Sequence, residues 1–113
     1  MAARHSPEGT TVAPTLQNNP DKHRYEAADD GKLVGYCEYN LLSGSIMFTH
    51  TEVLQGNEGK GIGSFIAKGV LDDARAQGLS VIPTCQFIAG YIRKHRAEYI
   101  DLVQPQTQAA FRI

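Results

Sequence analysis

Three glycines at alternate positions, Gly59, Gly61 and Gly63, stand directly before a run of residues with helical apolar spacing. Glycines leave successive backbone N–H groups uncovered at a helix N-terminus, where unpaired donors and the helix dipole favour an anion. The spacing matches neither the dinucleotide fingerprint nor the Walker A loop, because Lys60 is followed by Gly61 and not by Ser or Thr. On spacing alone, a phosphate cradle and a simple tight turn both remain open.

A second chemical feature is Cys85, which follows the short apolar run LSVIPT and precedes a second helical pattern. A thiol at a helix N-terminus has its thiolate form favoured, so Cys85 is a candidate nucleophile or proton relay. The alternative is a small buried apolar residue, since free cysteines are among the most buried side chains. Cys37 lies in the middle of a predicted strand and is expected to be structural.

His50 and Glu52 lie two residues apart in a predicted strand, so their side chains share one face and Thr51 points to the other. An imidazole titrates near neutral pH and burial tunes a carboxylate upward, so either group suits a general base. The alternative is a hydrogen-bonded pair that fixes strand register.

The run Arg93 to Arg96 is the one local basic cluster, suited to a phosphate or simply to a solvated helix end.

These residues need a scaffold, and the patterns predict one of mixed α/β class. Turn chemistry and alternation predict an antiparallel meander of three strands, followed by a helix, a parallel strand and a second helix. A right-handed crossover makes the last strand parallel to the third. The predicted strands are about His23 to Ala28, Leu33 to Asn40, Ser45 to Leu54 and Leu79 to Thr84. The predicted helices are about Gly61 to Gln77, with Gly78 as the C-terminal cap, and Gln86 to His95.

Length and composition limit the remaining possibilities. A chain of 113 residues with 42% apolar residues suits one small domain. We expect it at 19–103, between a disordered tail at 1–18 and a C-terminal tail at 104–113 whose Phe111 and Ile113 could dock on the body. A net charge of -1 disfavours nucleic acid, two cysteines provide no zinc spacing or disulfide framework, and no metal is expected. No stretch resembles a signal peptide or a membrane span, so we expect the cytoplasm.

The segment EGKGIGSFI, preceded by HTEV and followed by a helix, a strand and a second helix, resembles the acyl-coenzyme A motif of the GNAT superfamily of N-acetyltransferases. More closely, the stretch from HTEV to DLV is similar to a small single-module acetyltransferase-like subfamily with His-Thr-Glu-Val, Glu-Gly-x-Gly-Ile-Gly and Pro-x-Cys segments. The resemblance covers about 19–103. Glu58 replaces the Gln or Arg of the wider superfamily, so only the backbone part of that motif carries over.

The resemblance implies a minimal GNAT-like fold, acetyl-coenzyme A as cofactor and an amine of unknown identity as acceptor. It places the pyrophosphate on the loop and helix start, the pantetheine along the preceding strand, and the acyl thioester near Cys85, with His50 and Glu52 close by. Tyr91 is then either a proton donor to the leaving thiolate or a core residue. The implied cofactor-binding residues are Thr51, Val53, Glu58, Gly59, Lys60, Gly61, Ile62, Gly63, Ser64, Tyr91, Lys94 and His95.

Two functions remain open at this stage. One is an acyl-coenzyme A dependent N-acetyltransferase that acts by direct attack or through a Cys85 acyl-enzyme. The other is a non-catalytic module that binds coenzyme A or its thioesters. The first two predicted strands are joined by a tight turn, without the helices that wall the acceptor site in larger superfamily members, so the sequence leaves the acceptor and the oligomeric state unassigned.

Overall fold

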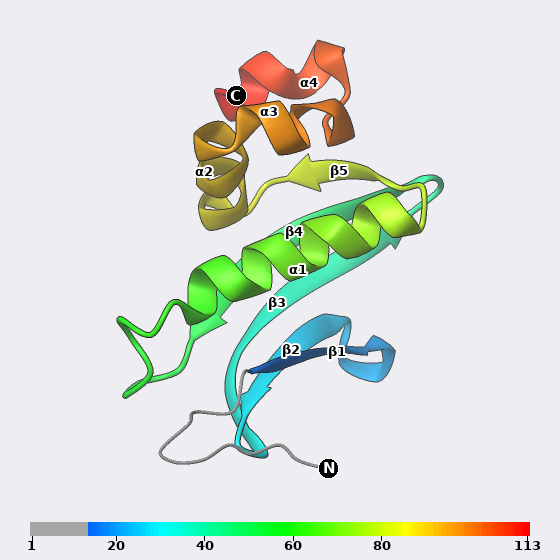
Figure 1. The fold of residues 1–113 in the computed structure, drawn as a ribbon. Helices are drawn as coiled ribbons and strands as arrows, with labels where there is room; N and C mark the ends of the chain where they lie inside the picture. The colour runs from blue at the N-terminus through cyan, green and yellow to red at the C-terminus, as the bar shows by residue number, and fades with distance from the viewer. Residues whose placement is uncertain (1–13) are drawn as a thin grey trace.

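The five strands of the fold form one mixed sheet in the order β1-β2-β3-β4-β5 (Figure 1). The computed structural model describes residues 14–113. Neighbouring strands from β1 to β4 pair antiparallel and β5 pairs parallel to β4, which confirms the predicted α/β class, meander and parallel strand. The strands are β1 (Thr15–Asn19), β2 (Arg24–Asp29), β3 (Lys32–Leu42), β4 (Ser45–Val53) and β5 (Ser80–Pro83).

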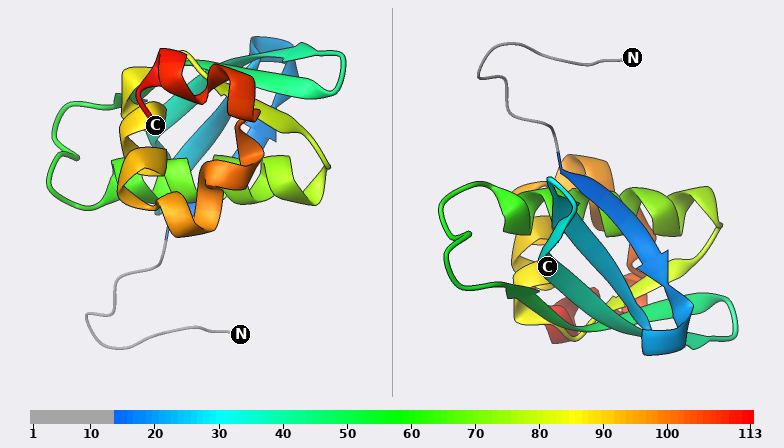
Figure 2. Two further views of the ribbon diagram at one scale, coloured as in Figure 1. Left: turned by 90° about the horizontal axis from the view of Figure 1, so that it is seen from above. Right: turned by 90° about the horizontal axis from the view of Figure 1, so that it is seen from below.

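The helices pack along the sheet and at its β5 edge. Helix α1 crosses the middle strands, and α2, α3 and α4 gather beside β5 (Figure 1), while the loop between β4 and α1 projects from one end of the molecule (Figure 2). The α-helices are α1 (Ile62–Ala76), α2 (Gln86–Lys94), α3 (Arg96–Tyr99) and α4 (Pro105–Gln108). Single 3-10 turns are η1 (Pro20–Lys22), η2 (Ile100–Leu102) and η3 (Ala109–Phe111).

Helix α1 is held at both ends. Its C-terminus forms the predicted glycine cap, in which the Gly78 N–H donates to Arg75 O and the Leu79 N–H donates to Ala74 O. Its first turn lies against Gly35 of β3, where a Cβ would come within 2.9 Å of Ile66 Cδ1. This contact sets how closely the start of α1, and therefore the glycine loop, approaches the sheet.

Strand β1 corrects the predicted N-terminal tail, because residues 15–18 pair with β2 instead of extending as a tail. Leu16 packs directly on Gly69 of α1. A Cβ added to this glycine would come within 2.5 Å of Leu16 Cδ2. The sequence TLQNN has one apolar residue and lies at the edge of the sheet, so it shows no alternation for a pattern to detect. The rest of the predicted tail, residues 1–13, lies outside the described part of the chain.

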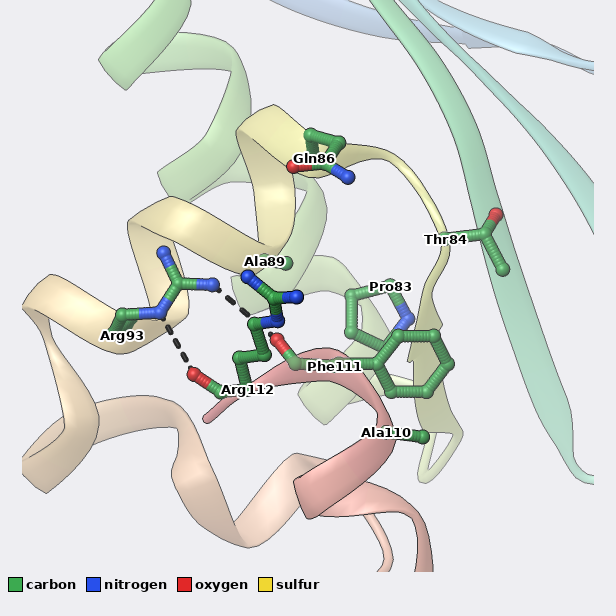
Figure 3. A pocket seen from close by; sticks show the side chains of 8 residues that line it. All are labelled: Pro83, Thr84, Gln86, Ala89, Arg93, Ala110, Phe111 and Arg112. Carbon is green, nitrogen blue, oxygen red and sulfur yellow. Dashed lines mark hydrogen bonds between the residues drawn. The ribbon is translucent and has the colours of Figure 1, made fainter.

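The C-terminal segment also corrects a prediction, since residues 104–113 fold back onto the body. Arg93 of α2 donates from Nε to Arg112 O at 2.8 Å and from Nη2 to Phe111 O at 3.3 Å (Figure 3). Ile113 packs against the core, which confirms that this segment can dock. Short helical turns of low apolar content carry little periodicity, and for that reason the pattern resembled a tail.

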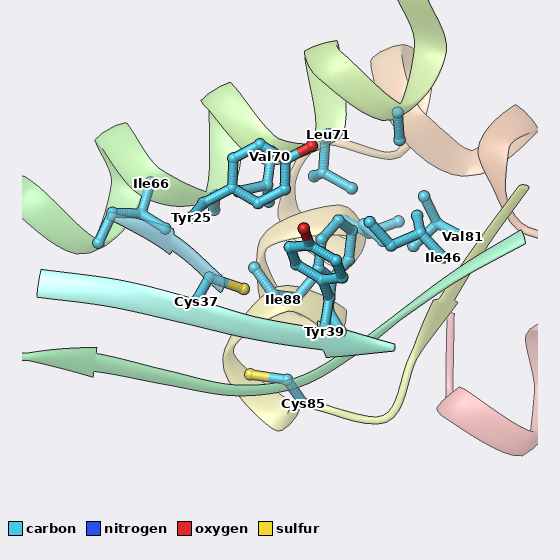
Figure 4. Close-up of a cluster of buried hydrophobic side chains, with 14 of the residues drawn as sticks. Tyr25, Cys37, Tyr39, Ile46, Ile66, Val70, Leu71, Val81, Cys85 and Ile88 are labelled. Atoms are coloured by element: carbon cyan, nitrogen blue, oxygen red, sulfur yellow. The ribbon is translucent and has the colours of Figure 1, made fainter. Parts of the chain in front are cut away.

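The core lies between α1, α2 and the helix-facing side of the sheet (Figure 4). Its centre is mostly aliphatic, with Ile66, Leu71 and Ile88 fully buried beside the ring of Phe48. Both cysteines belong to it. The candidate site therefore rests directly on the hydrophobic core.

Candidate functional site

Strands β4 and β5 pair over only part of their length. Their register ends at Phe48 and Pro83, where Phe48 O accepts from the Thr84 hydroxyl and from the Cys85 N–H, both at 2.8 Å. Beyond this point the chain turns into α2, whereas β4 continues to Val53 and pairs only with β3. The parallel pair thus opens into a gap that has Cys85 at its closed end.

The free edge of β4 presents unpaired backbone groups to this gap. The Leu54 N–H donates to Val34 O at 2.9 Å, so Leu54 faces β3. Antiparallel pairs alternate, and therefore Glu52 faces β3 while Thr51 and Val53 direct their N–H and C=O groups to the opposite edge. An extended ligand can pair with such groups as an added strand would.

The glycine loop lies at the open end of the gap and forms a cradle of backbone donors. The first helical bond of α1 runs from the Phe65 N–H to Gly61 O, so the N–H groups of Ile62, Gly63 and Ser64 have no partner within the helix. No side chain caps them. Gly59 and Gly61 have φ of 79° and 76°, and a Cβ on either would meet nothing within 4 Å. The space beside Gly59 and Gly61 is therefore open, and Ile62, Gly63 and Ser64 line the same hollow.

Gly63 has a different role from the other two glycines. A Cβ there would come within 2.8 Å of Phe87 Cζ, so Gly63 leaves room for the Phe87 ring between the first turns of α1 and α2. Phe87 is 44% exposed. Its helical spacing with Ile88 and Tyr91 is nevertheless typical of a core residue. The better signal was the stripe of Phe87, Gly90, Tyr91 and Lys94, which is offset from Ile88 and Ile92.

The loop side chains are engaged with the loop itself. Glu58 Oε1 accepts from the Gly56 N–H at 2.9 Å, and Lys60 Nζ lies 3.5 Å from Asn57 Oδ1. The Ile62 side chain is buried in the core. At Glu58 and Ile62 the backbone is therefore the part that the loop offers to a ligand, whereas the ammonium group of the exposed Lys60 stays accessible.

A continuous groove runs from the end of β4 over the loop to α2. It consists of two hollows of about 310 and 280 Å³ that share Ser64 and Phe87. The first hollow is lined by Val53, Asn57, Glu58, Gly59, Gly61, Ile62, Gly63, Ser64 and Phe87. The second is lined by Ser64, Phe87, Gly90, Tyr91, Lys94 and His95. Most of the predicted cofactor-binding residues therefore lie in one groove, although sequence analysis missed Asn57, Phe87 and Gly90.

At the closed end of the gap, the Thr51 hydroxyl lies between the two thiols. Thr51 Oγ1 is 3.3 Å from Cys85 Sγ and 3.4 Å from Cys37 Sγ. Cys85 is the N-cap residue of α2, as the sequence predicts (Figure 4). Burial raises the pKa of the Cys37 thiol to about 12, with smaller effects from Thr51, Cys85 and Glu38, so Cys37 stays protonated at neutral pH.

His50 and Glu52 lie on the other face of β4 from the thiols. His50 Nε2 and Glu52 Oε1 are 2.9 Å apart, and the two side chains are 52% and 46% exposed. The Tyr36 ring lies 6.2 Å from the His50 ring. The predicted shared face is confirmed, but neither side chain lines the groove, so any role in the chemistry requires a substrate that approaches from the exposed face.

The basic cluster is divided between two sides of α2. Lys94 and His95 line the groove, and the Tyr91 ring packs on the His95 ring at 4.3 Å between centroids. Arg93 instead contacts the C-terminal segment. Tyr91 is half-buried against the core at the outer end of the groove.

A family model for the GCN5-related N-acetyl-transferases matches residues 24–102, which is more than half of the chain. The chain belongs to this family. No curated protein matches it. The five-stranded mixed sheet is compatible with a compact fold of this family, whose members act with an acyl-coenzyme A thioester and an amine acceptor.

Two further structural properties concern only residues 14–113. None of the helices in this part of the chain is long and apolar enough to cross a membrane. Across the same residues, no group of three or more His, Cys, Asp or Glu side chains is arranged to hold a metal ion.

Proposed function

We propose that this protein is an N-acetyltransferase that binds acetyl-coenzyme A in the groove and transfers the acetyl group to an amine. The observation that carries the proposal is the opening of β4 from β5 directly beside a cradle of unpaired N–H groups at the start of α1. Family membership supports the cofactor class. The amine itself is not identified by either observation.

The groove fits the successive parts of coenzyme A. The open backbone groups of Thr51 and Val53 suit the amides of pantetheine. The cradle from Gly59 to Ser64 suits the pyrophosphate, because a Cβ on Gly59 or Gly61 would only occupy free space. Lys94 and His95, at the far end of the groove, suit the 3′-phosphate.

When bound, acetyl-coenzyme A supplies an activated acetyl thioester. Cys85 lies at the closed end of the gap and at the N-terminus of α2, which stabilises negative charge there. In a direct route, the amine attacks the thioester and Cys85 only lines the site. In a two-step route, the Cys85 thiolate would displace the coenzyme A thiolate from the acetyl group, and the amine would then displace Cys85 and lose its proton.

His50 and Glu52 are the proposed general base. They form a hydrogen bond with one another on the open face of β4, where an incoming ammonium group can lose its proton to them or to bulk water. A non-catalytic coenzyme A binding module is the second candidate. The observation that favours it is the separation of this pair from Cys85 by the sheet.

Turnover separates the two candidates. Release of free coenzyme A from acetyl-coenzyme A is measured with and without a panel of primary amines, with hydrolysis subtracted. Amine-dependent release that is lost in Gly61→Val supports the transferase. Tight binding of coenzyme A with no amine-dependent release over the whole panel would instead identify a binding module.

A further inference from the structure

A third hollow, of about 310 Å³ (Figure 3), lies on the other flank of α2 from the groove. Gln86, Ala89 and Arg93 of α2 line it, at the i, i+3, i+7 spacing of one helix face. The opposite wall consists of Phe111 and Arg112 in the folded C-terminal segment. The volume is at the small end of the roughly 300–1,000 Å³ that is usual for ligand pockets.

Two guanidinium groups line this hollow without an acidic neighbour. Neither Arg93 nor Arg112 forms an ion pair within residues 14–113, and no acidic residue lines the hollow. Arg93 uses one N–H on Nε and one on Nη2 for carbonyl oxygens, which leaves three of its five N–H groups. The positive charges of Arg93 and Arg112 repel one another, so the binding of an anion between them would be favoured.

The backbone turn that carries Arg112 is held by hydrogen bonds. Arg112 has φ of 59°, a left-handed conformation that is strained for a residue other than glycine. The turn closes because the Arg112 N–H donates to Ala109 O, while Arg112 O accepts from Arg93. One arginine therefore fixes the backbone that carries the other.

The hollow adjoins the candidate reaction centre. Thr84 and Gln86, the two chain neighbours of Cys85, both line it. Thr84 and Cys85 donate to the same carbonyl oxygen of Phe48 at the closed end of the gap. The end of the hollow that Thr84 and Gln86 line therefore lies beside the closed end of the gap.

We propose that this hollow binds the acceptor, a small primary amine that also carries a carboxylate. The proposal rests on the transferase function proposed above and adds the chemical class of its acceptor. Arg93 and Arg112 hold the carboxylate, since a guanidinium fork matches carboxylate geometry. Phe111 and Pro83 provide apolar contact for the carbon chain, and the amine end lies at Thr84 and Gln86, the chain neighbours of Cys85.

Binding is tested with two probes of equal shape, 3-phenylpropionate and 3-phenylpropanamide, on the full chain saturated with coenzyme A. Backbone amide shifts of Thr84, Gln86 and Arg112 are followed by NMR. We expect saturable shifts with the carboxylate and at least about tenfold weaker binding of the amide, because only the carboxylate pairs with the arginines. Arg112→Gln should weaken carboxylate binding to the same extent, whereas Arg96→Gln, a matched loss of charge outside the hollow, should not.

Turnover with phenylalanine and phenylalaninamide then tests the acceptor role, with a higher kcat/KM expected for the acid. Equal binding of the two probes, or undiminished carboxylate binding in Arg112→Gln, would overturn the inference. A preference for phenylalaninamide in turnover would overturn it too. Failure of the proposed function has a different signature, because neither phenylalanine nor any amine of the panel would then cause release of coenzyme A, while the probe result at Arg112 still stands.

Discussion

Cys37 and Cys85 lie on either side of one hydroxyl group, but they differ in access. Cys37 is fully buried in the middle of β3, and burial raises its pKa to about 12. Cys85 is 6% exposed and caps α2 at the end of the gap. Because the thiolate is the reactive form, the protonated Cys37 should react slowly with electrophiles over the range of about pH 7 to 9.

We therefore expect iodoacetamide to alkylate Cys85 faster than Cys37, and coenzyme A to slow the reaction at Cys85. The rates are measured by intact mass, with Cys37→Ala and Cys85→Ala identifying each site. Incubation with acetyl-coenzyme A should add one acetyl group that is lost in Cys85→Ala if the two-step route operates. Faster reaction at Cys37, or a Cys85 rate unaffected by coenzyme A, would place the reaction centre elsewhere.

Lys94 and Arg96 provide a matched pair for the 3′-phosphate. Lys94 lines the groove, and Arg96 lies two residues beyond in α3, outside both hollows of the groove. Lys94→Gln should weaken coenzyme A binding by about threefold to tenfold and dephospho-coenzyme A binding much less. Arg96→Gln should change neither. Calorimetry at low and high salt measures the affinity of the protein for both ligands. Equal affinities at all salt concentrations would show that Lys94 does not bind the 3′-phosphate and is simply a solvated residue at the end of α2.

At the scale of elements, the packing of α1 on β3 positions the cradle. A Cβ on Gly35 would meet the backbone oxygen of Glu52 at 2.8 Å and Ile66 Cδ1 at 2.9 Å, and a backbone atom cannot simply rotate away. Gly35→Ala should therefore lower the free energy of unfolding by roughly 1–3 kcal/mol. It should also weaken coenzyme A binding, since α1 must move relative to β4.

Gly90→Ala is the control for this substitution. The nearest atom to its added Cβ would be Arg93 Nη1 at 3.8 Å, and alanine favours a helix, so the free energy of unfolding should hold or rise. Both variants are compared by urea denaturation. If Gly35→Ala proves as stable as the parent chain and binds coenzyme A normally, the close approach of α1 to β3 does not set the geometry of the cradle.

The elements also show what the sequence can and cannot predict. The glycine loop, Cys85 at the start of α2 and the parallel strand follow from local signals, because turn residues, caps and apolar periods act over a few positions. The different role of Gly63 does not follow from local signals, because it depends on the Phe87 ring of α2. Tertiary contact of this kind leaves no trace in spacing.

At the scale of the whole molecule, the segments that the sequence did not predict are β1 and the C-terminal segment, at the two ends of the described residues. β1 pairs with β2 and packs on α1 through Leu16, and the C-terminal segment is held by Ile113 and by carbonyl oxygens that accept from Arg93. Backbone acceptors belong to every residue, so no residue type marks them in advance. The third hollow, which has the C-terminal segment as one wall, could therefore not be predicted from the sequence.

The proposed function depends most on the placement of the coenzyme A pyrophosphate on the cradle from Gly59 to Ser64. The most direct test is a calorimetric titration of coenzyme A into Gly61→Val, with Gly31→Val as a matched control. Both glycines have left-handed φ, 76° and 78°, and a Cβ on either would meet nothing within 4 Å, but Gly31 lies in the turn between β2 and β3. Valine should strain both backbones similarly.

We predict that the parent chain and Gly31→Val bind coenzyme A with similar affinity, and that Gly61→Val binds at least about tenfold more weakly while circular dichroism shows it folded. The difference between the variants then reports the cradle and not a general loss of stability. Normal binding by a folded Gly61→Val, or equal weakening in both variants, would contradict the account.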